Sequence, residues 1–165
     1  MMKITGVSAR QNGLQYTLTF YTEVGPVNLA SKLNIKEGQS LLIMNEPETY
    51  RERLRPLPEG AKYISDAGEG MADFVQVFVK SLDDINRWVP RAIRVLKHDG
   101  LFWVTYPKKT SGVTTDIKGE KNWKVMREAG LSPVERVSIS DIWIAVRFRP
   151  VEKTDRLRIP VLRLK

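Results

Sequence analysis

The sequence predicts a doubly wound α/β domain with a mainly parallel sheet that is shortened in its first half and ends in an antiparallel strand pair. Three continuous apolar runs, at residues 41–44, 74–79 and 101–106, are typical of strands covered by helices on both faces. Helical patterns alternate with these runs through short connections, which indicates βαβ units and parallel pairing. The last two expected strands, 134–139 and 142–149, are separated by only two residues, so that pair must be antiparallel.

Length and composition limit the organisation of the chain. A chain of 165 residues with 42% hydrophobic residues can bury one sizeable core. We expect a β-hairpin extension over residues 1–24, the α/β domain over 25–150 and a basic tail over 151–165. Cysteine is absent and His98 is the single histidine, so we predict no disulfide, no thiolate site and no histidine-rich metal site. Without a secretory signal pattern or an apolar run of ~20 residues, we expect a cytoplasmic protein with no membrane partner.

Positive charge is concentrated at the C-terminal end. Of the formal net charge of +8, the segment from Arg147 to Lys165 carries +5, from seven basic and two acidic residues. Basic side chains that neutralise phosphates release counterions, so nucleic acid is one partner for such a tail. A terminal basic segment more often keeps a protein soluble or contacts an acidic partner. A basic nucleic-acid-binding module therefore stays an alternative.

The N-terminal segment is expected to form a hairpin. Asn12-Gly13 supplies the positive φ angles of a tight turn between strands at 4–10 and 14–21, and a short helix over 27–33 leads into the main domain. The hairpin and the tail could close sheet edges within one chain or pair with those of a neighbour. A homodimer is therefore also open.

A capped helix is expected after the second apolar run. Ser81 followed three residues later by Asp84 is a capping-box pattern that predicts the start. Pro90 removes an amide donor, which predicts a kink or a new turn. Gly100 is the expected left-handed stop, and His98 would serve the same helix end.

The polar loop after the third apolar run is the predicted binding segment. Open α/β sheets place ligands at the carboxyl ends of their strands. The expected ligand residues are Lys108, Lys109, Thr110, Ser111, Gly112 and Asp116. A helix over 117–129, with Asp116 as N-cap and Gly130 as stop, would add its positive end. We predict a small anionic ligand bearing a phosphate or carboxylate; a solvated flexible loop is the alternative.

The second half of the chain resembles class I methyltransferases. The resemblance rests on a helix ending in residues 95–100, the strand 101–106, a further helix and the antiparallel pair. Three segments carry a closer resemblance: residues 33–38, 107–116 and 140–143. In that combination the chain is similar to an uncharacterised bacterial domain-of-unknown-function family of short methyltransferase-like proteins. The resemblance covers about residues 25–150 and implies a Rossmann-like, methyltransferase-like fold.

The first half departs from the methyltransferase pattern. The turn after the first strand, residues 45–49, contains Pro47 and no glycine, so side chains would crowd the space that S-adenosylmethionine uses. Glu46 and Glu48 could instead cap a helix over about 48–55. Only one further short strand, 62–64, fits before the second apolar run, where a usual methyltransferase has an additional strand and helix.

These observations lead to one functional expectation and two alternatives. We expect a methyltransferase-like domain without standard methyltransferase activity and without a cofactor, binding an anionic small ligand or a protein partner. The first alternative is an active S-adenosylmethionine-dependent methyltransferase, whose cofactor residues would be Asn45, Glu46 and Asp66, the last on ribose hydroxyls. Asp141 and Trp143 could face the same cleft, or Asp141 could simply bond turn amides. No catalytic nucleophile and base pair is identified.

Overall fold

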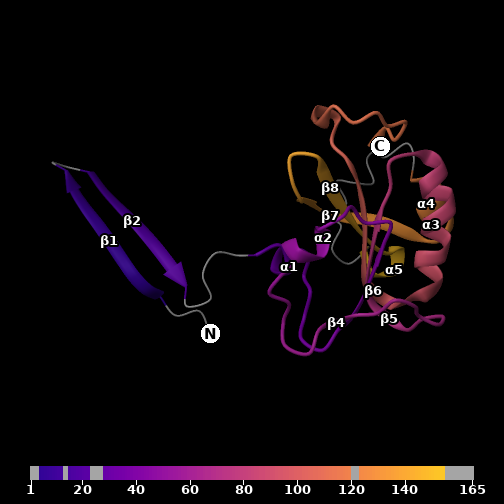
Figure 1. Ribbon diagram of the computed structural model, residues 1–165, viewed down its shortest axis with the longest axis horizontal. Helices are drawn as coiled ribbons and strands as arrows, with labels where there is room; N and C mark the ends of the chain where they lie inside the picture. The colour runs from indigo at the N-terminus through magenta and orange to yellow at the C-terminus, as the bar shows by residue number, and fades with distance from the viewer. Residues whose placement is uncertain (1–3, 13–14, 23–27, 120–122, 155–165) are drawn as a thin grey trace.

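The computed structural model describes residues 4–12, 15–22, 28–119 and 123–154, which form two separate sheets (Figure 1). The first is the antiparallel pair of β1 (Ile4–Asn12) and β2 (Gln15–Thr22), which confirms the predicted hairpin. The residues that connect the two strands, 13–14, lie outside the described part of the chain, as does the tail beyond residue 154.

The second sheet has six strands in the order β4-β3-β5-β6-β8-β7. Its strands are β3 (Ser40–Met44), β4 (Lys62–Tyr63), β5 (Ala72–Phe78), β6 (Leu96–Pro107), β7 (Leu131–Ser138) and β8 (Trp143–Pro150). β4, β3, β5 and β6 run parallel, whereas β8 is antiparallel to both β6 and β7. The mainly parallel sheet with an antiparallel last pair is therefore confirmed.

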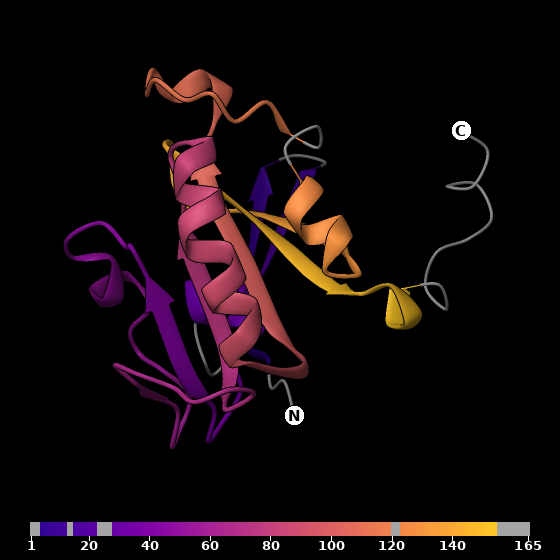
Figure 2. The same ribbon diagram turned by 90° about the vertical axis from the view of Figure 1, so that its right-hand side faces the viewer.

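Helices cover both faces of this sheet. They are α1 (Leu29–Lys32), α2 (Tyr50–Arg53), α3 (Leu82–Val95), α4 (Lys124–Glu128) and α5 (Val151–Thr154), with a 3-10 turn η1 (Lys109–Ser111). α1 and α2 pack in one core cluster, α3 and α4 in the other, and Figure 2 shows α3 lying lengthwise along its face. None of the helices in the described ranges is long and apolar enough to cross a membrane.

Strand β3 shows how the sequence fills both layers. Successive side chains on a strand point to opposite faces. Leu41 and Ile43 therefore join the cluster under α1 and α2, whereas Leu42 and Met44 join the cluster under α3 and α4. A strand with both faces covered needs a continuous apolar run, which is why the runs predicted the strands correctly.

The start of α3 is capped by three side chains. Ser81 Oγ accepts from the amide of Asp84 at 3.1 Å, as predicted. Asp84 in turn accepts from the amide of Lys80 at 2.8 Å, and Asp116 accepts from the amide of Leu82 at 2.8 Å. Asp116 thus caps α3 from a distant loop, rather than the helix that follows it in sequence.

The predicted end of α3 is wrong. The helix continues through Pro90 and ends at Val95, and Leu96 already has extended backbone angles. Gly100 therefore lies inside β6 and does not stop a helix, and His98 likewise belongs to the strand. The chain passes from the last helical turn directly into extended backbone at Leu96, where φ is −72°, so no residue in the left-handed conformation is needed.

Residues 97–100 bulge out of the sheet. Leu96 pairs with Ala72 and Leu101 pairs with Phe74, so β6 uses four intervening residues where β5 uses one. A Cβ at Gly100 would lie 2.8 Å from Leu96 Cδ1 and 3.0 and 3.1 Å from two backbone oxygens. Glycine is required here because the bulge brings backbone close to backbone.

The predicted helix over 117–129 is also wrong in its first half. α4 begins only at Lys124, and its N-cap residue Trp123 makes no side-chain capping bond. Ile117 is buried in extended or irregular backbone, so it anchors the loop to the core without a helix. The stop was predicted correctly, since Gly130 follows the helix with φ of 74°.

A chain of buried polar side chains crosses the core under α2. The Tyr50 hydroxyl donates to Gln76 Oε1 at 2.8 Å, and Gln76 Nε2 donates to Thr105 Oγ1 at 2.9 Å. Burial raises the pKa of Tyr50 far above its ordinary value, which keeps the hydroxyl protonated as a donor. Nearby, the Trp103 indole donates to the Leu33 carbonyl at 3.1 Å, which fastens β6 to the end of α1.

Candidate functional site

The sheet reverses its direction of winding between β3 and β5. β4 lies on one side of β3 and β5 on the other, and at such a point open α/β sheets leave a crevice at the carboxyl ends of the strands. A pocket of about 310 Å³, here called the crevice pocket, opens there. It is lined by Asn45, Glu46, Pro47, Phe78, Lys80, Asp84 and Trp143.

Asn45 lines two neighbouring pockets at this crevice. Its backbone takes the left-handed conformation with φ of 58°, which asparagine tolerates better than most residues, so the turn forms without glycine. Its side-chain Nδ2 donates to the Phe78 carbonyl at 2.9 Å and so ties the end of β3 to the end of β5. Asn45 also lines a second, smaller pocket of about 180 Å³, called the side pocket, together with Asp66 and Trp88.

The turn of residues 45–49 does not use Glu46 as the predicted helix cap. Glu46 does not cap α2 but forms an ion pair with Arg51 at 2.7 Å. The N-cap of α2 is Thr49, which has a φ of 64° and makes no side-chain capping bond. Asp66 accepts from the adjacent Ala67 amide at 2.8 Å, as a loop aspartate does.

Trp143 forms the aromatic floor of the crevice pocket. It is only 9% exposed and meets Phe78 edge to face, with ring centroids 5.1 Å apart. The Lys80 ammonium lies 6.0 Å from the Trp143 ring centroid, within reach of a cation–π attraction. Lys80 and Asp84 were not among the predicted site residues, although their position after the second apolar run was a signal for them.

Asp141 and Trp143 do not share a role. Trp143 lines the crevice pocket, whereas Asp141 is exposed at the β7–β8 turn and is not part of that lining. Ser140 organises the turn, because its hydroxyl oxygen accepts from the amides of Ile142 and Trp143 at 3.2 and 3.1 Å.

The lysine loop at the end of β6 is held by hydrogen bonds to β7 and the β7–β8 turn and by bonds within the loop. Lys108 Nζ donates to Ser138 Oγ at 2.6 Å, and the Lys108 amide donates to the Ile142 carbonyl at 2.7 Å. Ser111 Oγ donates to the Lys108 carbonyl at 2.7 Å, and Gly112 turns the chain with φ of 77°. Ser111 and Gly112 therefore shape the loop and are not lining residues of its pocket.

This loop borders a third pocket, the loop pocket, of about 280 Å³. Its apolar lining residues are Tyr106, Pro107, Ile117 and Ile144, and the polar ones are Lys108, Lys109 and Thr110 together with the backbone of Gly119. No helix begins directly after the loop, so the positive helix end expected there does not contribute. The two ammonium groups and one hydroxyl are the polar groups that the loop offers to a ligand.

Comparison with solved structures identifies the architecture. A candidate type 11 methyltransferase from Sulfolobus solfataricus matches with a TM-score of 0.53 and 14% identity, over 74% of this chain and 89% of that one. The complex between the Haloferax volcanii Trm112 methyltransferase activator and the candidate methyltransferase matches with a TM-score of 0.51 and 13% identity, over 73% of this chain and 86% of that one. The fold is methyltransferase-like. No family model matches the chain, and no curated protein does.

A third match shows that this methyltransferase-like fold is not confined to proteins described as methyltransferases. A candidate exported protein from Bordetella parapertussis matches with a TM-score of 0.50 and 8% identity, over 70% of this chain and 63% of that one. At such identities the similarity establishes the fold, and function has to be argued from the sites. Within the ranges that the structure describes, no three histidine, aspartate or glutamate side chains gather in a way that could hold a metal ion.

Proposed function

We propose that this methyltransferase-like domain binds a small organic anion in the loop pocket and does not transfer methyl groups. The observation that carries the proposal is the division of that pocket into an apolar floor and a cationic rim. Lys108 and Lys109 supply positive charge, while Tyr106 and Ile117 supply apolar surface. Few polar groups on a mostly apolar surface are what orient a small ligand in a pocket.

Lys108 and Lys109 differ in burial, so we expect them to contact a ligand in different ways. Lys108 is half-buried and its ammonium is held by Ser138, which pre-orients a donor toward a carboxylate or phosphate oxygen. Lys109 and Thr110 are exposed, so they can move to a ligand as it arrives. A ligand with a compact apolar body and one anionic group would use both parts of the pocket.

Replacing Lys108 and Lys109 together by alanine is expected to abolish stabilisation by a small organic anion. In thermal unfolding, wild-type protein should gain Tm with phenyl phosphate, because a ligand at 100 times its Kd stabilises by about 2.7 kcal/mol. Inorganic phosphate should give a smaller gain, since it leaves the apolar floor unused. The double variant should show neither gain.

A matched control separates the pocket from the general charge of the protein. Lys32→Ala with Lys36→Ala removes the same charge from exposed positions on and after α1. This control should keep the full response to phenyl phosphate. Equal stabilisation of the Lys108 and Lys109 double variant would contradict the proposed site.

The fold comparison favours an active methyltransferase as the second candidate. Asn45 and Asp66 lie together in the side pocket, where a cofactor ribose would be bound, and Glu46 lies in the crevice pocket beyond Asn45. Against this, the Asn45 side chain crosses the crevice to the Phe78 carbonyl, where related folds use glycine so that a cofactor can approach the backbone. Asn45 thus lies between two spaces of about 310 and 180 Å³.

Calorimetry with S-adenosylmethionine and S-adenosylhomocysteine tests this second candidate. We expect no binding heat with the wild-type protein, and a measurable affinity in Asn45→Gly if the bridging side chain is what closes the crevice. Micromolar binding by the wild-type protein that disappears in Asp66→Ala would instead establish a working cofactor site. That result would overturn the proposal that no methyl transfer occurs, independently of the loop pocket.

We also propose a family, a cellular location and possible partners for this protein. Segments 33–38, 107–116 and 140–143 support membership of the bacterial domain-of-unknown-function family described above, and we propose a cytoplasmic location. A protein partner is supported by one neighbour, which was solved in a complex with a methyltransferase activator. Nucleic-acid binding would depend on the basic tail, most of which lies outside the described residues.

A further inference from the structure

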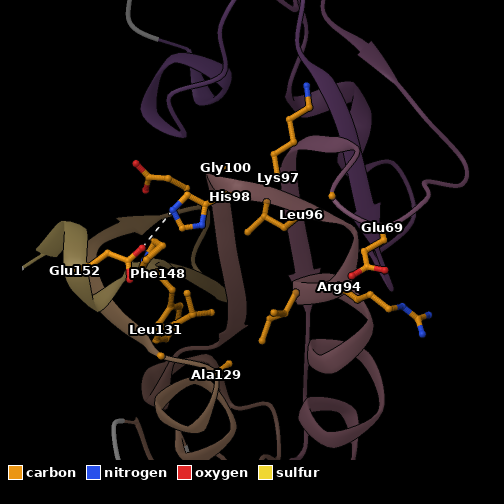
Figure 3. Close-up of a pocket in the computed structure, with 15 residues that line it drawn as sticks. Glu69, Arg94, Leu96, Lys97, His98, Gly100, Ala129, Leu131, Phe148 and Glu152 are labelled. Atoms are coloured by element: carbon orange, nitrogen blue, oxygen red, sulfur yellow. Dashed lines mark ion pairs between the residues drawn. The ribbon is translucent and has the colours of Figure 1, made fainter.

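A separate cavity of about 520 Å³ lies at the opposite end of β6 from the lysine loop (Figure 3). We call it the amino-edge cavity, because it opens where β5, β6 and β7 begin. Its apolar lining consists of Ile93, Leu96, Ala129, Leu131, Phe148 and Pro150. Its volume falls within the range of about 300–1,000 Å³ that is usual for small-molecule sites.

The bulge of residues 97–100 builds one wall of this cavity. Asp99 takes a left-handed backbone with φ of 55°, and its carboxylate is held by Arg149 through two bonds of 2.9 and 2.7 Å. The amide of Val151 donates to the Gly130 carbonyl at 2.9 Å, which joins the start of α5 to the residue before β7. These hydrogen bonds therefore join the segments that line the cavity to one another.

The basic side chains around the cavity either bond to another residue or extend away from the apolar floor. The Lys97 ammonium bonds Asp73 at 2.7 Å, and it lowers the pKa of that carboxyl. Figure 3 shows the Lys97 and Arg94 side chains extending away from the apolar floor. The same view places Glu69 and Glu152 on opposite sides of it.

Glu69 and Glu152 make the rim of the cavity negatively charged. Glu152 Oε1 lies 3.2 Å from His98 Nε2. The imidazole offsets the negative charge of Glu152 only when the imidazole is protonated. Asp99 is neutralised by its paired arginine. A ligand that enters the cavity therefore meets an apolar floor with carboxylates on two sides.

We propose that the amino-edge cavity binds a small organic cation with an apolar body, such as an arylalkylamine. The apolar body would bury against Leu96, Leu131 and Phe148, where each Å² removed from water contributes roughly 25 cal/mol. The ammonium would lie toward the Glu69 or Glu152 carboxylate. An organic anion would have to approach both carboxylates, so this site selects the opposite charge from the loop pocket.

The test compares three probes of similar shape and different charge on the full chain. These are 2-phenylethylamine, 2-phenylethanol and 3-phenylpropanoate, and their Kd values are measured by NMR titration. The amine should bind about 1.4- to 5-fold more tightly than the alcohol, since one exposed ion pair contributes about 0.2–1 kcal/mol. The anion should bind more weakly than the alcohol. Equal binding of amine and alcohol, tighter binding of the anion, or no binding of the amine would overturn the proposal.

Three variants locate the binding. Glu69→Gln with Glu152→Gln should remove the preference for the amine and leave the alcohol unaffected, while Glu37→Gln with Glu59→Gln, both exposed elsewhere, should change nothing. Ala129→Phe places a ring at an exposed lining position, so it should weaken all three probes without disturbing the core. Amine binding that survives Ala129→Phe unchanged would show that the ligand binds elsewhere and would overturn the site.

Discussion

Gln76→Leu is expected to lower the free energy of unfolding by about 2–6 kcal/mol, because it leaves two buried hydroxyls without a partner and each such group costs about 1–3 kcal/mol. Gln76 is fully buried and lies between the hydroxyls of Tyr50 and Thr105. Leucine has a similar volume, so lost hydrogen bonding and not a cavity causes the loss. Urea denaturation followed by circular dichroism measures it.

A double-mutant cycle separates this loss from general disruption of the core. Tyr50→Phe alone leaves Gln76 Oε1 unbonded and should cost about 1–3 kcal/mol. The double variant should be more stable than the sum of the two single losses predicts, because removing both partners leaves fewer unsatisfied groups. Strict additivity would show that the hydrogen bond between Tyr50 and Gln76 does not couple the two residues.

Trp103→Ala is expected to lower the free energy of unfolding by about 3–5 kcal/mol, the usual cost of truncating a buried tryptophan. Trp103 has no exposed surface, and its indole donates to the Leu33 carbonyl. The substitution therefore creates a cavity and also removes the bond that holds the end of α1. Hydrogen exchange should show faster opening of residues 29–35 than of α3.

Trp88→Ala serves as the control for this prediction. Trp88 is only partly buried on α3, so its truncation should cost clearly less than that of Trp103. It should also leave exchange at α1 unchanged. Equal protection of residues 29–35 in both variants would show that α1 does not depend on the indole bond.

The strands of the main sheet could be predicted from sequence, but two helix boundaries could not. Continuous apolar runs identify strands buried on both faces, and this signal is local. Gly100 was misassigned because a glycine after a helical pattern is typical of a helix stop, whereas here it allows a close backbone approach within β6. Ile117 is buried in the same core cluster as Trp123 and Met126 although its backbone is not helical, so its burial did not indicate where the helix begins.

The candidate sites were predictable only in part, for a related reason. The lysine loop does follow β6 at its carboxyl end, because residues after a parallel strand lie at that edge of the sheet, and its role in binding stays a prediction. Asp116 was assigned to the wrong helix, since its bond to the Leu82 amide joins residues that are far apart in the sequence. The amino-edge cavity gave no local signal, because it forms between Leu96, Leu131 and Phe148 from three different strands.

The two outer strands of the six-stranded sheet have a further consequence. β4 has only two residues, and the other outer strand, β7, contains Pro133, which lacks an amide hydrogen, next to a shift in register. Neither strand is a good template for another chain to extend the hydrogen-bond ladder. We therefore expect concentrated solutions of this domain to resist fibril growth from these two edges, and self-association, where it occurs, to use surfaces other than these ladder edges.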